Sequence, residues 1–197
     1  MNNHGGPRPS AVVATRAVEE YLAELLDEVV EAPDGHVQHE DSSAQWRDRD
    51  NVFEVRVVTV AGLTLAIPSA EIVACDRLSV ESLKPDLKYL QAGLGLLRRS
   101  NTAAPRVLDF AALVLPAERR PVRTSRKPPP HVLILAGERW ALACDGVGRS
   151  EDVDPQQVQW RDRQGQRPWL CGMLPMLNAA LVDPQALVAA ALLEEQG

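Results

Sequence analysis

The sequence is poor in the residues that most catalytic and metal sites use. It has three cysteines and four histidines in 197 residues, and aromatic residues make up 4%. His4, His36 and His39 lie near the N-terminus, and His131 follows three prolines, so no histidine is paired with a candidate nucleophile. No glycine-rich phosphate-binding loop is present. We therefore expect no enzymatic activity, no cofactor and no metal site.

Other absences bear on the compartment. Cys75, Cys144 and Cys171 are odd in number, widely spaced and flanked by small or apolar residues, which predicts buried free thiols in a reducing cytoplasm. The first ten residues lack the basic and apolar regions of a signal peptide. No apolar run approaches the roughly 18 residues of a transmembrane helix. The expectation is a cytoplasmic protein that is not inserted in a membrane.

The charge is concentrated at one end of the chain. The net charge is −6, and residues 1–50 contain four arginines and no lysine against eleven acidic residues. The remaining residues contain 17 basic and 16 acidic side chains, so their charge is nearly balanced. Residues 119–127 are rich in arginine and proline but lack interleaved aromatics for base stacking. We expect a solvated connector there, and no nucleic-acid binding.

Residues 1–51 form the acidic N-terminal arm, which contains one amphipathic segment. Apolar residues over about 15–31 recur at helical spacing, and Pro33 prevents continuation. Residues 32–51 are polar and predict a flexible linker. The helix either docks on the rest of the chain or binds another protein, and we predict the second. Its apolar stripe is Val18, Tyr21, Leu22, Leu25, Leu26 and Val29, and its opposite face has Glu24, Asp27, Glu28 and Glu31.

The rest of the chain, 52–197, contains a faint internal repeat. Residues 55–67 and 131–142 each consist of a β-rich run, an Ala-Gly pair and a second run, and Gly62 aligns with Gly137. This pattern predicts a tight hairpin that is used twice. Short strands with many turns predict small β-barrels. The strands are expected at 53–60, 63–68, 70–76, 94–98, 105–110, 131–136, 139–144, 146–152 and within 168–182, and a final helix begins at Asp183-Pro184.

Three aspartates, Asp109, Asp145 and Asp183, each follow an apolar run. Two such carboxylates in one cleft would suit general acid and base catalysis, so a carboxylate-based hydrolase or a small-molecule-binding β-barrel is the alternative function. We favour structural roles, in which the carboxylates accept hydrogen bonds from backbone N–H groups in turns and at helix starts. Trp160 and Trp169 flank three arginines, a mixture found in protein interfaces, although Trp169 sits in an apolar run typical of a core.

Several segments, taken in order, resemble the CheW-like coupling domain of bacterial chemotaxis. They are GLTLAIPSAEIV (62–73), GLGLLRR with VLDFAAL (93–99 and 107–113), RWALACDGVGRSEDVDPQQVQW (139–160), RPWLCGML (167–174) and ALVDPQALVAAL. The resemblance covers about 52–193. With its acidic N-terminal segment and its tryptophan-rich DPQQVQWR…RPWL stretch, the chain is most similar to ParP-type proteins of polar arrays. The resemblance implies two intertwined five-stranded SH3-like β-barrels, with the N-terminal amphipathic helix and a short C-terminal helix outside them.

The resemblance also implies a function. A CheW-like protein is a non-enzymatic scaffold that links a CheA-type histidine kinase to chemoreceptors, and a ParP-type protein would add a ParA-like polar anchor as a partner. The receptor would dock at Leu96, Leu97, Arg98, Arg99 and Asn101. The family's usual Asn-Leu-Arg-Gly turn is replaced here by the sequence LRRSNT (97–102), in which Arg98 or Arg99 matches the family arginine. This departure favours a specialised role in array integration at the cell pole.

Overall fold

The computed structural model describes residues 52–86, 92–99, 104–123, 127–161 and 167–194. The N-terminal arm lies outside these residues, and so do the predicted site residue Asn101 and the helical stripe Val18, Leu22, Leu25, Leu26 and Val29. Among the described residues, no helix is long and apolar enough to cross a membrane.

The described chain consists of two halves that have the same order of elements. Each half begins with a hairpin, continues through four further strands and ends in a helix. The first half comprises β1 (Phe53–Val60), β2 (Leu63–Pro68), β3 (Ile72–Arg77), β4 (Leu83–Lys84), β5 (Gly93–Leu97), β6 (Arg106–Asp109) and α3 (Phe110–Val114). The second comprises β7 (His131–Leu135), β8 (Trp140–Cys144), β9 (Gly146–Val153), β10 (Gln159–Trp160), β11 (Leu170–Leu174), β12 (Ala179–Val182) and α4 (Pro184–Glu194).

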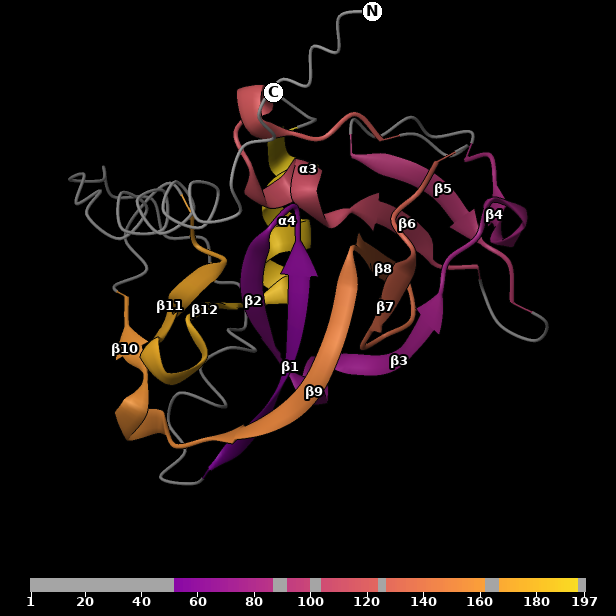
Figure 1. The fold of residues 1–197 in the computed structure, drawn as a ribbon. Helices are drawn as coiled ribbons and strands as arrows, with labels where there is room; N and C mark the ends of the chain where they lie inside the picture. Colours follow the sequence, from indigo (N-terminus) through magenta and orange to yellow (C-terminus); the bar gives the residue numbers. More distant parts are fainter. Residues whose placement is uncertain (1–51, 87–91, 100–103, 124–126, 162–166, 195–197) are drawn as a thin grey trace, which may run out of the picture.

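Strands from both halves are interleaved in two six-stranded sheets (Figure 1). Sheet A has the order β10-β11-β12-β2-β1-β9, and sheet B has the order β3-β7-β8-β6-β5-β4. The hairpin of one half thus shares a sheet with four strands of the other half. In each sheet the halves meet at two pairings. One is parallel, β12 with β2 in sheet A and β6 with β8 in sheet B, and the other is antiparallel, β1 with β9 and β3 with β7. Neither sheet can be completed by one half alone.

The predicted hairpins are confirmed, but the Ala-Gly pair takes a different place in each turn. The residues with positive φ are Ala61 and Gly62 in the first turn and Gly137 and Glu138 in the second. Ala61 and Gly62 both have positive φ, at 50° and 88°, as a two-residue type I′ turn requires. Gly137 likewise has a φ of 82° in the turn between β7 and β8. Glycine adopts this region without the steric cost that a Cβ atom imposes.

The repeat extends far beyond the hairpins. Ala66 lies opposite Leu181 in one parallel join, and Ala141 lies opposite Val107 in the other. The two alanines are as far apart along the chain as Gly62 and Gly137, so they occupy equivalent positions of the repeat. Two short 3-10 helices, η2 (Val80–Ser82) and η4 (Pro155–Gln157), also correspond, and each is capped by the side chain that precedes it. The whole described body therefore follows a single two-fold plan.

Three clusters of buried side chains follow from this plan. One lies within sheet A and includes Phe53, Val55 and Leu181, and another lies within sheet B and includes Leu97, Val107 and Ile134. The largest draws on both sheets and both helices. Its members include Leu65, Phe110, Leu133, Leu142 and Leu187. The largest core therefore forms only when the two halves are together.

The prediction of a mainly β fold with a C-terminal helix is confirmed, with two corrections. The segment expected to continue as a strand to residue 110 turns at Asp109 into the helix α3, because the Asp109 carboxylate accepts a hydrogen bond from Ala111 N–H and caps it. Cys75 is exposed rather than buried, because β3 is an edge strand of sheet B. The five-stranded barrels remain a prediction, since the hydrogen-bonded sheets have six strands each.

Equivalent irregularities interrupt β5 and β11. The register shifts between Gly93 and Gly95, and again between Leu170 and Gly172. A Cβ atom on Gly95 would lie 2.5 Å from Lys84 O, and one on Gly172 would lie 2.4 Å from Gln159 O. Both glycines are therefore required by the close approach of a neighbouring strand's backbone.

We predict that Gly95→Ala or Gly172→Ala lowers the free energy of unfolding by about 1–3 kcal/mol, because the new methyl group must displace backbone rather than a flexible side chain. Gly146→Ala is the matched control, since its Cβ would make an ordinary 3.6 Å contact with the Thr59 side chain. Urea unfolding of the three variants measures the difference. Equal stability of all three would contradict this role of the bulge glycines.

Candidate interaction site

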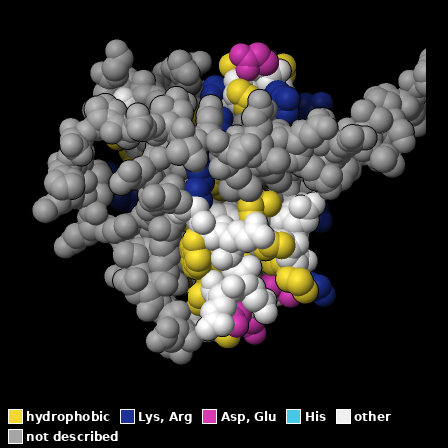
Figure 2. Space-filling model, turned by 90° about the vertical axis from the view of Figure 1, so that its left-hand side faces the viewer, with side chains coloured by type: hydrophobic (Ala, Val, Ile, Leu, Met, Phe, Trp, Pro, Cys, Tyr) yellow, Lys and Arg dark blue, Asp and Glu magenta, His cyan; other side chains and the backbone are white. Residues whose placement is uncertain are grey.

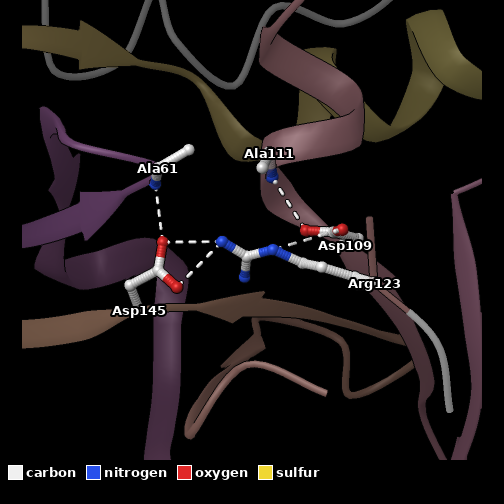
Figure 3. A network of polar contacts seen from close by, with 5 residues as sticks. All are labelled: Ala61, Asp109, Ala111, Arg123 and Asp145. Carbon is white, nitrogen blue, oxygen red and sulfur yellow. Dashed lines mark hydrogen bonds and ion pairs between the residues drawn. The ribbon is translucent and has the colours of Figure 1, made fainter. Parts of the chain in front are cut away.

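The structure brings two of the three candidate aspartates together around a single arginine (Figure 3). Arg123 Nη2 donates to both carboxylate oxygens of Asp145, at 2.8 and 2.7 Å, and Arg123 Nε lies 3.7 Å from Asp109 Oδ2. The Arg123 side chain is only 11% exposed. The connector between the halves is thus anchored at this point, whereas Arg119, Arg120, Val122 and Lys127 on either side are exposed, as expected of a solvated loop.

Both carboxylates also accept backbone hydrogen bonds, as predicted for structural aspartates. Ala61 N–H donates to Asp145 Oδ2 at 2.6 Å, and Ala111 N–H donates to Asp109 Oδ1 at 3.1 Å. The network therefore joins the first hairpin turn, the start of α3, the end of β8 and the connector. Burial raises the pKa of Asp109 above its ordinary value, while the Arg123 guanidinium and backbone N–H groups oppose this rise.

The third aspartate occupies the equivalent place in the second half. Asp183 caps α4 by accepting hydrogen bonds from the N–H groups of Gln185 and Ala186, at 3.0 and 3.1 Å. Gln185 Nε2 in turn donates to Glu71 Oε2 at 3.3 Å. Burial raises the pKa of Glu71. The Gln185 amide thus links the start of α4 to an acid of the first half, whereas the arginine of the connector lies beside the start of α3.

This geometry does not favour the alternative of a carboxylate enzyme. Asp109 and Asp145 converge, but the Arg123 guanidinium fills the space between them. A hollow of about 390 Å³ lies elsewhere, along β1 and β3, and its lining residues include Glu54, Arg56 and Cys75. Among the described residues, no group of three or more histidine, cysteine or acidic side chains could hold a metal ion.

The predicted receptor segment lies at the end of β5. Arg98 and Arg99 are exposed, Leu96 is half-buried, and Leu97 is buried in the sheet B cluster. Leu97 therefore supports the segment rather than offering a contact surface. Arg98 N–H donates to Ser82 O at 2.7 Å, and Arg99 forms an exposed ion pair with Glu138 at 3.3 Å.

Beside this segment lie two residues that sequence reasoning did not single out. The Arg106 guanidinium lies 5.8 Å from the ring centroid of Trp140, within the range of a cation–π contact, and its Nε donates to Asp86 Oδ2 at 2.8 Å. The parallel pairing of β6 with β8 places Arg106 directly opposite Trp140. Sequence alone offered one signal: each residue opens a short strand with a polar or amphipathic side chain before a buried run.

The tryptophan-rich region lies in the other sheet, at the edge of sheet A that ends in β10. Trp169 is 6% exposed and packs in the shared core, as its apolar surroundings predicted. Trp160 is half-buried and donates through Nε1 to Pro155 O at 3.0 Å. Figure 2 shows hydrophobic side chains gathered on the face that includes this edge, and Met176 between β11 and β12 is 85% exposed.

The comparisons with known proteins bear on the fold. No family model matches the chain, and no curated protein matches it in sequence. Among solved structures, the scaffolding protein TtCheW from Thermoanaerobacter tengcongensis is similar, with a TM-score of 0.54 and 10% sequence identity. The match covers 67% of this chain and 88% of that one. The described body therefore has a CheW-like fold.

We predict that Arg123→Met destabilises the protein by about 3 kcal/mol at neutral pH, because removing one partner leaves Asp109 as an uncompensated buried charge. The matched control is Arg149→Met, since Arg149 pairs with Glu151 on the surface, where its side chain is 86% exposed. An exposed pair of this kind contributes about 0–1 kcal/mol. The measurement is urea unfolding.

The pH dependence of the stability that Arg123→Met loses tests whether the charge of Asp109 causes the loss. Removing Arg123 raises the folded-state pKa of Asp109 further above its unfolded value, so the folded state binds a proton more readily. The loss should be complete above the folded pKa and should disappear as the pH falls below the unfolded pKa. Arg123→Met should therefore approach the parent in stability as the pH is lowered from 7 to 4. A pH-independent difference would point to lost packing instead.

Proposed function

We propose that the chain is a non-enzymatic coupling protein that links a CheA-type histidine kinase to chemoreceptors. The observation that supports this most is the CheW-like fold, because the match spans 88% of a protein that is itself a scaffold. The sequence motifs over 52–193 support the same proposal independently of the fold. The three aspartates serve as caps and as partners of Arg123, so the carboxylate hydrolase is not favoured.

We further propose a ParP-like role in polar arrays. The acidic arm would bind a ParA-like polar anchor through the stripe of the 15–31 helix. The CheW-like body would meanwhile hold the kinase and the receptor tip, and the chain would be a cytoplasmic component of a membrane-associated array. Support for this comes from the arm's charge and amphipathic pattern.

The proposed receptor contact is the exposed part of the segment at the end of β5. Converting Arg98 and Arg99 together to glutamate should weaken receptor association by about 1–3 kcal/mol, through lost charge-assisted bonds and new repulsion. The fold should tolerate the change, because both side chains are exposed and the Arg99–Glu138 pair is a surface contact.

Arg77→Glu is the matched control, since Arg77 is an exposed arginine on β3 at the far edge of sheet B. Affinity for a receptor-tip fragment, measured by calorimetry, should fall only in the double variant. Unchanged affinity in a folded double variant would remove this site.

Deleting the N-terminal arm should affect anchor binding but not folding or kinase binding. A chain that lacks residues 1–50 should melt as a folded protein and should still bind the kinase, because the described residues by themselves supply three clusters of buried side chains. It should no longer bind the polar anchor. Thermal melting and pull-down with the kinase and with the anchor test both parts, and aggregation of the shortened chain would show that the arm belongs to the core.

A further inference from the structure

The two-fold plan allows equivalent surfaces of the two sheets to be compared. In sheet B, Lys84, Leu96, Arg106 and Trp140 lie directly opposite one another on β4, β5, β6 and β8. Directly opposite residues in a sheet project from the same face. These four side chains therefore form one continuous row, the basic row.

Sheet A has the equivalent row, but with different chemistry. Gln159, Met173, Ala180 and Leu65 lie opposite one another on β10, β11, β12 and β2. Leu65 and Ala180 are 2% and 1% exposed and belong to the shared core, whereas their equivalents Trp140 and Arg106 are only half-buried. At these two inner positions the uncharged row is buried and the basic row is partly open. The outer positions match, because Gln159 and Lys84 are both exposed and Met173 and Leu96 are both half-buried.

The helices account for the difference. In sheet A, α4 runs for eleven residues, and Ala190 and Leu192 near its end pack against the same cluster as Leu65 and Ala180. Its counterpart α3 has five residues and stops at Leu115, which is extended, before Pro116. Among the residues that the structure describes, no helix takes the place over sheet B that the last turns of α4 take over sheet A. Figure 1 shows the contrast in length.

The charge of the basic row indicates what could cover it. Two cations are already compensated, Arg106 by Asp86 and Arg99 by Glu138. Within the described ranges, the exposed cations Lys84, Arg98 and Arg139 have no ion-pair partner. Arg139 is joined to the row through its carbonyl, which accepts a hydrogen bond from Arg106 N–H at 2.9 Å. Partly exposed Leu96 and Trp140 supply the apolar part of this surface.

We propose that the basic row is the intramolecular docking site of the acidic helix at residues 15–31. The arm is the strongly acidic part of this chain, with eleven acidic residues against four arginines in residues 1–50. At 3.6 residues per turn, Glu19 borders one side of its apolar stripe, and Glu28, at the edge of the acidic face, borders the other. The stripe then packs on Leu96 and Trp140, while the bordering carboxylates approach Lys84, Arg98 and Arg139.

Two physical limits fit this arrangement. A helix of this length is marginal alone in water, so its apolar stripe must be covered for the helix to persist. A flexible linker of some twenty residues has a root-mean-square reach of roughly 25 Å, which suits return to the same molecule. The docked arm occupies the position over sheet B that corresponds to the last turns of α4 over sheet A.

The docking of the arm does not depend on the proposed function, but it would affect receptor binding by this chain. The basic row adjoins Arg98 and Arg99, so the docked arm and a receptor tip would compete. Likewise, an anchor protein that binds the apolar stripe would release the row. The arm would then couple anchoring to receptor binding.

The test is amide hydrogen exchange of the full-length chain, read by mass spectrometry over residues 15–31. In dilute protein at low salt, exchange should be slowed at least about tenfold relative to the free 15–31 peptide. Glu19→Lys with Glu28→Lys should abolish the protection, and so should Lys84→Glu with Arg139→Glu. Combining both pairs should restore it. Asp27→Lys, opposite the stripe, and Lys127→Glu, on the connector, are the matched controls.

Each outcome decides the matter. Because the arm variants leave the body unchanged, loss of folding cannot explain their effect, and thermal melting checks the Lys84 and Arg139 variants. Protection that survives both charge reversals would place the arm on another surface and overturn the proposal. Protection that appears only at high protein concentration would show that a second copy is bound instead. Absence of protection in the parent would show that the arm is undocked.

Discussion

The two parallel joins, β6 with β8 and β12 with β2, are the constraint on which the rest of the structure depends. Each pairs strands that are distant in sequence within one sheet, and the shared core draws on both sheets. Arg123 secures the only covalent connection between the halves by pairing with Asp109 and Asp145. Folding must therefore bring both halves together at once, and a half-chain would leave the shared core exposed to water.

Against this symmetry, the differences between the halves mark where the molecule is specialised. The equivalent glycine bulges, capped turns and helix-capping aspartates maintain the frame in both halves. The helices differ in length, and the inner positions of the two rows differ in burial and charge, because sheet B has Arg106 and Trp140 where sheet A has Ala180 and Leu65. A duplicated frame with this local difference suits a protein that binds others, as the proposed coupling function requires.

The sequence predicted what depends on local chemistry. Gly62 and Gly137 predicted the hairpins because their turns require positive φ, and Asp183-Pro184 predicted the start of α4. The Arg123 network was not predicted, because Asp145 is bonded to Ala61, 84 positions away, and nothing local indicates such a contact. The helix α3 was missed because a five-residue apolar segment shows no period that distinguishes it from a strand. Of the proposed receptor segment, Arg98 and Arg99 are exposed but Leu97 is buried, and its role stays a prediction. The row with Arg106 and Trp140 required the strand pairing.

In the proposed function, one chain bridges a kinase and a receptor without chemistry of its own. The most direct measurement immobilises the regulatory domain of a CheA-type kinase and asks how much receptor-tip fragment it retains with and without the full-length chain. We expect little retention of the receptor fragment without the chain, and retention that rises in proportion to the chain added until the kinase is saturated. Receptor retention that is independent of the chain, or failure of the chain to bind either protein, would contradict it.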